Sequence, residues 1–102
     1  MQNATVNAKD LEHFEIAARA AGYEEVLERR WAPETLIELH THPFDAHAVV
    51  TQGEMWLTRD GVTQHLSIGD TFTIAREVPH AERYGAEGAT YLVARRTAGP
   101  IE

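Results

Sequence analysis

A change in hydrophobic period after Gly22 constrains the fold more than any other feature of this sequence. From residue 23 to residue 96, apolar and polar residues alternate in short segments that Gly, Pro and Asp-Gly turns interrupt. A period of two is typical of strands that bury one face. Many short strands at nearly even spacing indicate an antiparallel sandwich or barrel, here of roughly 8–10 strands. The chain is therefore predicted to be an all-β protein.

A short helix is predicted before the strands, over residues 10–21. Its apolar residues fall three and four positions apart and form one stripe, and Gly22 stands where a C-terminal cap belongs. A chain of 102 residues is long enough for one domain of this kind. We expect three regions: an N-terminal segment with the helix (1–22), the β-barrel (23–96) and a C-terminal tail (97–102).

Charge and composition argue against several classes of protein. The chain has 9 Lys and Arg against 16 Asp and Glu, so no basic surface for DNA, RNA or an anionic membrane is expected. It has no cysteine, which excludes disulfides, thiolate metal sites and thiol nucleophiles. No apolar run reaches the roughly 18 residues of a membrane-spanning helix, and the first residues lack the apolar core of a signal peptide. We expect a cytoplasmic protein without nucleic-acid or membrane partners.

Four of the six histidines fall in two short stretches and form the candidate metal site. His40 and His42 are two residues apart on a predicted strand, so both side chains face the same way, with Cα atoms roughly 6.6 Å apart. Imidazole suits Zn, Cu, Fe, Ni and similar ions. Two histidines do not complete a site, and His80 is the expected third ligand. The sequence thus predicts one divalent transition metal, with iron, manganese, nickel and zinc all left open.

The two histidine stretches resemble the two motifs of the cupin family, G-x5-H-x-H-x3or4-E-x6-G and G-x5-P-x-G-x2-H-x3-N. His40 and His42 fill the histidine pair of the first motif, and His47 stands in its glutamate position. Further positions of the two motifs fall, in order, on Gly53 (one residue early), Gly69, Ala75 (for proline), Glu77 (for glycine), His80 and Tyr84 (for asparagine). The resemblance covers most of the chain, from Trp31 to Arg96.

This resemblance implies a fold and a range of functions. Small single-domain, RmlC-like cupins are double-stranded β-helix, or jelly-roll, barrels with one hairpin between the motifs, as residues 53–69 would form here. Dioxygenases, isomerases, decarboxylases and lyases are the enzymatic precedents that the resemblance brings. It also implies a homodimer, and pairing would cover the open sheet edges of so small a barrel.

The missing glutamate leaves the fourth ligand open. Either His47 is a fourth ligand, or three histidines and water hold the metal. Strand parity places Glu82 on the face of His80, and Glu38 on the face of His40. Each carboxylate could ligate the metal, orient a ligand histidine or act as a base. We assign Glu82 as the catalytic acid–base residue. The assigned metal ligands are His40, His42, His47 and His80.

Two functions remain open for such a site. The first is a metal-dependent enzyme, dioxygenase-like or related, acting on a small organic molecule that enters the barrel mouth near Phe44, Phe72 and Tyr84. The second is a non-catalytic module that binds or senses a small ligand; a structural protein with a vestigial site belongs to this group. The sequence contains no output domain for a sensor, which favours the enzyme.

Two aspartates and two tryptophans are interpreted as structural residues. Asp45 and Asp70 lie beside Pro, Phe and Gly residues, so both are expected to stabilise turns. Trp31 and Trp56 are interpreted as core or subunit-contact residues rather than as residues that stack on a substrate.

Overall fold

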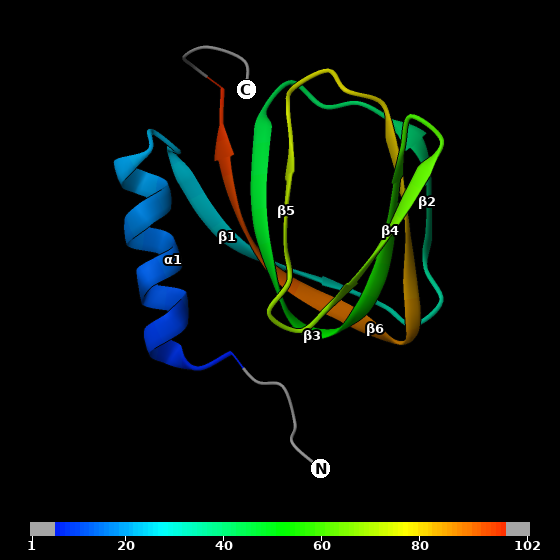
Figure 1. The fold of residues 1–102 in the computed structure, drawn as a ribbon, viewed down its shortest axis with the longest axis horizontal. Helices are drawn as coiled ribbons and strands as arrows, with labels where there is room; N and C mark the ends of the chain where they lie inside the picture. Colours follow the sequence, from blue (N-terminus) through cyan, green and yellow to red (C-terminus); the bar gives the residue numbers. More distant parts are fainter. Residues whose placement is uncertain (1–5, 98–102) are drawn as a thin grey trace.

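The computed structural model describes residues 6–97 and contains one helix and six strands in this range. The helix, α1 (Ala8–Ala20), begins after Asn7 in a capping box with Asp10 and lies beside the barrel that the strands form (Figure 1). No helix in this part of the chain is long and apolar enough to cross a membrane. The strands are β1 (Glu25–Trp31), β2 (Leu36–His40), β3 (Asp45–Arg59), β4 (Val62–Ser67), β5 (Thr71–Ile74) and β6 (His80–Arg96).

The two longest strands, β3 and β6, run antiparallel along most of their length and form the frame of the barrel. The first half of β3 and the second half of β6 lie between β5 and β1, a layer that we call sheet I. The other halves lie between β4 and β2, in a layer that we call sheet II. Both layers belong to one continuous antiparallel sheet. This arrangement confirms the predicted jelly-roll barrel with a short N-terminal helix.

Glycines allow β3 and β6 to bend where they cross. The register between the two strands shifts on both sides of Gly53, which has a φ of +72°. A Cβ atom at Gly53 would lie 2.1 Å from the carbonyl oxygen of Gly88, and one at Gly88 would lie 2.2 Å from that of Trp31. Close approach and positive φ therefore both require glycine. The sequence predicts strand ends at Gly53 and between Gly85 and Gly88. The structure corrects this, because each pair of expected strands is one continuous strand.

Residues of β3 face alternately into and out of the barrel, and in the first half of the strand the outer face lies toward the helix. Met55 and Leu57 point inward with at most 1% exposure and fill the interior of sheet II. In the first half of the strand, the small side chain of Ala46 points inward. Because side chains alternate along a strand, the next residue, His47, faces the opposite side. The alternation thus decides which residues of this strand can reach a site inside the barrel.

Helix α1 packs on the outer face of sheet I. Its residues Phe14 and Ala18 contact Tyr23 and the sheet residue Ala94, which together form a small apolar cluster outside the barrel. Figure 1 shows the helix lying along the β1 side of the barrel. The predicted helix over residues 10–21 is therefore observed with nearly the same bounds, and its apolar stripe faces the sheet.

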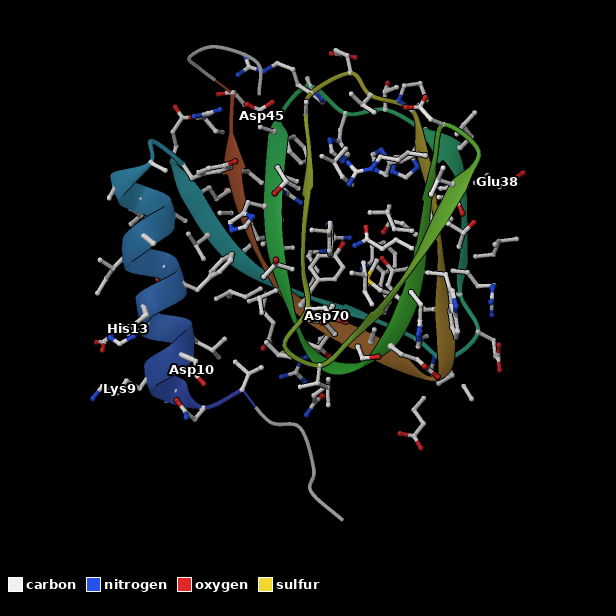
Figure 2. The ribbon with its side chains drawn as sticks, viewed as in Figure 1. Lys9, Asp10, His13, Glu38, Asp45 and Asp70 are labelled. Atoms are coloured by element: carbon white, nitrogen blue, oxygen red, sulfur yellow. The ribbon has the colours of Figure 1, made fainter. Side chains whose placement is uncertain are left out.

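Asp45, the first residue of β3, is fully buried and joins three segments of the chain. Its carboxylate accepts hydrogen bonds from the Arg76 amide at 2.8 Å, from Arg76 Nη2 at 3.0 Å and from Arg96 Nη2 at 3.0 Å. The hydrogen bonds from the Arg76 side chain, above all, hold the pKa of Asp45 well below its usual range. Asp45 is thus a buried ion-pair residue rather than the expected turn residue. Asp70, labelled in Figure 2, does stabilise a turn. Its carboxylate accepts a hydrogen bond from the Ser67 amide.

Candidate metal centre

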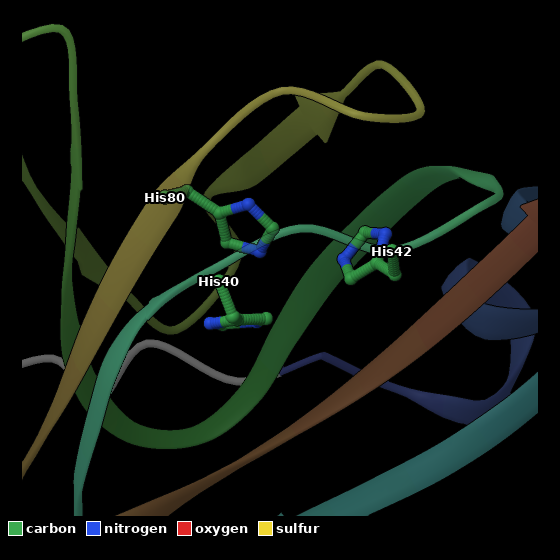
Figure 3. A group of neighbouring side chains, drawn as sticks. All are labelled: His40, His42 and His80. Atoms are coloured by element: carbon green, nitrogen blue, oxygen red, sulfur yellow. The ribbon is translucent and has the colours of Figure 1, made fainter.

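Three of the predicted ligands, His40, His42 and His80, come together at one end of the barrel interior. His40 ends β2 and His80 begins β6, and the two residues are paired in register. His42 lies two residues beyond the end of β2. One ring nitrogen from each histidine can be chosen so that all three lie within 4.8 Å of one another. Figure 3 shows the three side chains converging from these two neighbouring segments. This triad could hold a metal ion.

Backbone hydrogen bonds set the tautomer of each ring in the triad. The Nδ1 atoms of His40, His42 and His80 contact, in order, the carbonyl oxygens of Glu38 (2.8 Å), Phe44 (3.2 Å) and Val78 (2.9 Å). A carbonyl oxygen only accepts, so each Nδ1 carries the proton and each Nε2 keeps its lone pair free. The Nε2 atom of His80 is buried and has no hydrogen-bond partner in the described part of the chain. This donor set fits a transition metal, whose histidine ligands are commonly fixed by such second hydrogen bonds.

The charge state of the triad also suits metal binding. Burial lowers the pKa of both His42 and His80, because the charged imidazolium is poorly solvated inside the barrel. The neighbouring rings lower both pKa values further, since positive charges close together disfavour one another. A metal binds the neutral form of imidazole. His42 and His80 therefore present unprotonated rings at neutral pH.

Glu82 lies beside the triad, as strand parity predicts. Its side chain is 8% exposed, and its Oε2 atom is 3.6 Å from His40 Nε2 and 3.5 Å from His80 Nε2. Its Oε1 atom accepts a hydrogen bond from the hydroxyl of Tyr84. Burial raises the pKa of Tyr84, so this hydroxyl stays protonated and remains a donor. The carboxylate thus has one oxygen fixed by tyrosine and one directed at the imidazoles.

His47 does not join the triad, and its assignment as a fourth ligand is corrected. Its Nδ1 atom lies 3.0 Å from the hydroxyl of Thr73, and its ring stacks on Phe14 of the helix with centroids 5.0 Å apart. The inward residue is Ala46, which is separated from His42 by three residues. The family motif allows three or four residues here, and the structure uses three. Alanine therefore stands where the family has glutamate.

Glu38 does not face the site either, because β2 is irregular. The pairing of β2 with β6 shifts between Ile37 and His40: Ile37 pairs with Glu82, and His40 pairs with His80. Three steps on β2 match two on β6, so residues two apart no longer share a face. Figure 2 shows Glu38 on the outer side of the barrel. Only its backbone carbonyl serves the site, as the acceptor for His40.

A cavity of about 180 Å³ lies beside the triad. Phe44 and Phe72 line it, as expected, whereas Tyr84 does not belong to the lining. Sequence reasoning missed the two charged residues of the wall, Arg29 and Arg95. The available signal was strand parity, since Arg29 lies between the inward residues Leu27 and Trp31. The complete lining is Arg29, Trp31, Ile37, His40, His42, Phe44, Ala46, Phe72, Ile74, His80, Glu82, Tyr91, Val93 and Arg95.

A jelly-roll barrel with three converging histidines beside an internal cavity defines the class of this protein. Residues 28–94, well over half of the chain, match the family model of the cupin domain. The chain therefore belongs to the cupin family. A search of curated proteins finds no significant sequence match.

Several solved structures resemble the chain at low sequence identity. One of the DMSP lyases RdDddP and RnDddQII is 24% identical with a TM-score of 0.65, over 72% of this chain and 38% of that one. An RmlC-like cupin from Shewanella frigidimarina is 22% identical with a TM-score of 0.63, over 72% of this chain and 65% of that one. Bacillus subtilis oxalate decarboxylase, in a study of its Mn(II) centres, is 25% identical with a TM-score of 0.63, over 70% of this chain and 20% of that one. The chain thus spans less than two thirds of each of these three proteins.

Proposed function

We propose that this protein is a metal-dependent enzyme that acts on a small organic molecule. His40, His42 and His80 hold one divalent transition metal, and Glu82 is the acid–base residue beside it. One observation carries the proposal: three Nε2 lone pairs converge beside a cavity, and that of His80 is buried without a hydrogen-bond partner in the described chain. Such a lone pair is costly unless something binds it.

The bound metal would polarise a substrate oxygen or activate water or dioxygen. The chain's own residues perform the remaining tasks. Glu82 can hold or move a proton at Oε2, because Oε1 is engaged by Tyr84. The apolar walls from Trp31 and Ile37 exclude water from the reacting groups. Together these residues supply a proton carrier and a partly dry cavity, which a purely structural metal site does not need.

The similar structures support an enzyme with a redox-capable or Lewis-acidic metal. Two of them are a DMSP lyase and an oxalate decarboxylase, and the second has Mn(II) centres. Iron, manganese, nickel and zinc all accept imidazole ligands. Dioxygenase-like chemistry requires iron or another redox-active ion, whereas lyase chemistry does not.

Metal loading combined with a small exogenous ligand tests the proposal without knowledge of the substrate. Protein purified without a nickel column is stripped with chelator, loaded with Co(II) or Fe(II), and assayed for metal content by mass spectrometry. We expect one metal per chain and a spectral change when azide is added to the cobalt form or nitric oxide to the iron form. Three protein ligands leave coordination positions open to such molecules. A bound metal that ignores both ligands would instead support a non-catalytic binding or structural protein.

We also propose a homodimer that forms through β2. This strand pairs with β6 alone among the described strands and carries Leu36 and Leu39, which are 66% and 70% exposed. An edge strand with exposed leucines is a ready site for pairing with a second copy. Light scattering at micromolar concentration should give about twice the 11.4 kDa chain mass, and Leu39→Lys should lower it. A wild-type mass of one chain would contradict the dimer.

A further inference from the structure

Two arginines line the cavity from the side of sheet I. Arg29 lies on β1 and Arg95 on β6, both in sheet I, and both line the cavity. The triad belongs to β2, the loop after it and the start of β6, on the sheet II side. Both arginine side chains are half-buried, and burial of a charge is unfavourable unless it is paired. The pair therefore points to a ligand.

Both guanidinium groups stack on aromatic rings and keep hydrogen-bond donors available. The Cζ atom of Arg29 is 4.8 Å from the ring centroid of Trp31, and that of Arg95 is 4.5 Å from the ring of Phe44. Stacking engages the flat face of the guanidinium and leaves the N–H groups at its edge. A planar edge with two parallel N–H groups matches a carboxylate.

The two arginine side chains have few hydrogen-bond partners among the described residues. The side chain of Arg29 makes no hydrogen bond or ion pair with any residue from 6 to 97. The Nε atom of Arg95 is buried and has no partner in the same range. The Nη1 atom of Arg95 lies 3.6 Å from the carboxylate of Glu25, whose side chain is 61% exposed. Both arginines thus keep N–H groups that have no hydrogen-bond acceptor among the described residues.

The charges that line the cavity favour an anion. Two arginines face one buried carboxylate, that of Glu82, and a divalent metal on neutral histidines would add positive charge. We propose that the cavity binds a small organic carboxylate, with the carboxylate held by Arg29 or Arg95 and the other end of the molecule directed at the triad. The orientation of the ligand toward the triad rests on the proposed function. The volume of about 180 Å³ corresponds to roughly six water molecules, so the ligand is small.

A matched pair of probes, succinate and its uncharged analogue succinamide, tests the inference. Binding is measured by calorimetry on zinc-loaded protein and on chelator-treated, metal-free protein. We expect the wild type to bind succinate at least about tenfold more tightly than succinamide, because charged hydrogen bonds to arginine are lost with the amide. Part of this preference should persist without metal. The measurement on metal-free protein detects carboxylate binding by the arginines alone. The inference can therefore be tested even if the proposed function is wrong.

Arginine variants identify the group that recognises the carboxylate. Arg29→Gln and Arg95→Gln should each weaken succinate binding by about 10- to 100-fold and leave succinamide binding unchanged. Arg30→Gln and Arg83→Gln are matched controls on the same strands, since both side chains are exposed and should have no effect. Circular dichroism checks the fold of each variant. If one variant fails to fold, the comparison of succinate with succinamide on the wild-type protein still tests whether the cavity prefers a carboxylate. Equal binding of the two probes, absent binding of both, or wild-type succinate affinity in both cavity variants would overturn the inference.

Discussion

At the scale of single residues, the second nitrogen of each imidazole determines what the ring can bind. In the triad, every Nδ1 donates to a backbone carbonyl, so the main chain orients the rings before any metal arrives. A buried polar atom without a partner costs about 1–3 kcal/mol, and a cation would remove this cost at His80 Nε2. His47 differs because it is stacked on Phe14 and hydrogen-bonded to Thr73. The two kinds of histidine should respond differently to substitution.

The first prediction contrasts His80→Ala with His47→Ala. The first change removes one of the three ligands of the triad. Two imidazoles do not complete a site, so bound metal should fall to less than about a tenth of the wild-type content. The second change removes a ring that packs under α1, so metal content should stay near the wild-type value. Elemental analysis after dialysis against the metal measures both. Metal loss in His47→Ala with an intact fold would restore His47 to the site.

The second prediction concerns the carboxylate beside the triad. Glu82→Gln keeps the size of the side chain but cannot carry a proton, so turnover should fall by about 10²–10⁴-fold. Metal content should hardly change, because three histidines remain. Glu54→Gln is a suitable control, since Glu54 pairs with His65 on the outer surface. If metal content falls in parallel with turnover, Glu82 is a ligand rather than a proton carrier.

Strand parity predicts part of this site and fails at identifiable points. His40, His42, His80 and Glu82 come together as the sequence indicates, because the motif spacing survives in the fold. The prediction for Glu38 fails because an irregularity in β2 breaks the alternation of side chains. The assignment of His47 fails because the loop after His42 uses one residue fewer, which only the three-dimensional path of the chain decides. The cavity arginines were missed because parity alone cannot show which strand faces a cavity.

At the scale of elements, the crossing of β3 and β6 depends on glycines in close contact. Gly88→Ala should be strongly destabilising, because the new Cβ would lie 2.2 Å from the Trp31 carbonyl oxygen and the residue has a φ of +73°. We expect a loss of about 3 kcal/mol in the free energy of unfolding, from backbone strain and from overpacking. Gly61→Ala is a matched control with a φ of +74° and nothing within 4 Å, so only the strain of about 1–2 kcal/mol applies. Urea denaturation compares them, and equal losses would contradict the crowding argument.

The same glycines explain which features of the elements could be predicted. The period of two identifies the strands, and the stripe on residues 10–21 identifies the helix, because both depend on local burial patterns. The continuity of β3 and β6 could not be predicted, since Gly53 and Gly88 read as strand ends in sequence. Only the packing of one backbone against the other shows that these glycines permit a bend within a strand.

At the scale of the whole molecule, the Asp45 cluster ties the barrel together at the end where the chain leaves it. The buried carboxylate links the start of β3, the loop after β5 through Arg76, and the end of β6 through Arg96. These segments are distant in sequence, and Arg96 also donates to the Ala21 carbonyl after α1. Two guanidinium groups share one carboxylate, so its removal would take away an ion-pair partner from both at once. Stability should therefore depend on the charge of a single residue.

The last prediction follows from the pKa of that residue. The folded-state pKa of Asp45 is below its ordinary value of 3.8, so the native state binds fewer protons than the unfolded state in this range. Its contribution to stability is fully present above about pH 4 and is lost as pH falls through the lower, folded-state pKa. Asp45→Asn should cost about 3 kcal/mol at neutral pH, and the difference from wild type should shrink as pH falls below 4. Urea denaturation of chelator-treated protein over this pH range measures the difference. Histidine protonation occurs in both proteins and cancels.

Asp70→Asn, in an exposed turn, is the control and should cost under about 1 kcal/mol. A difference for Asp45→Asn that stays constant from pH 7 to pH 2 would show that the carboxylate charge does not stabilise the fold.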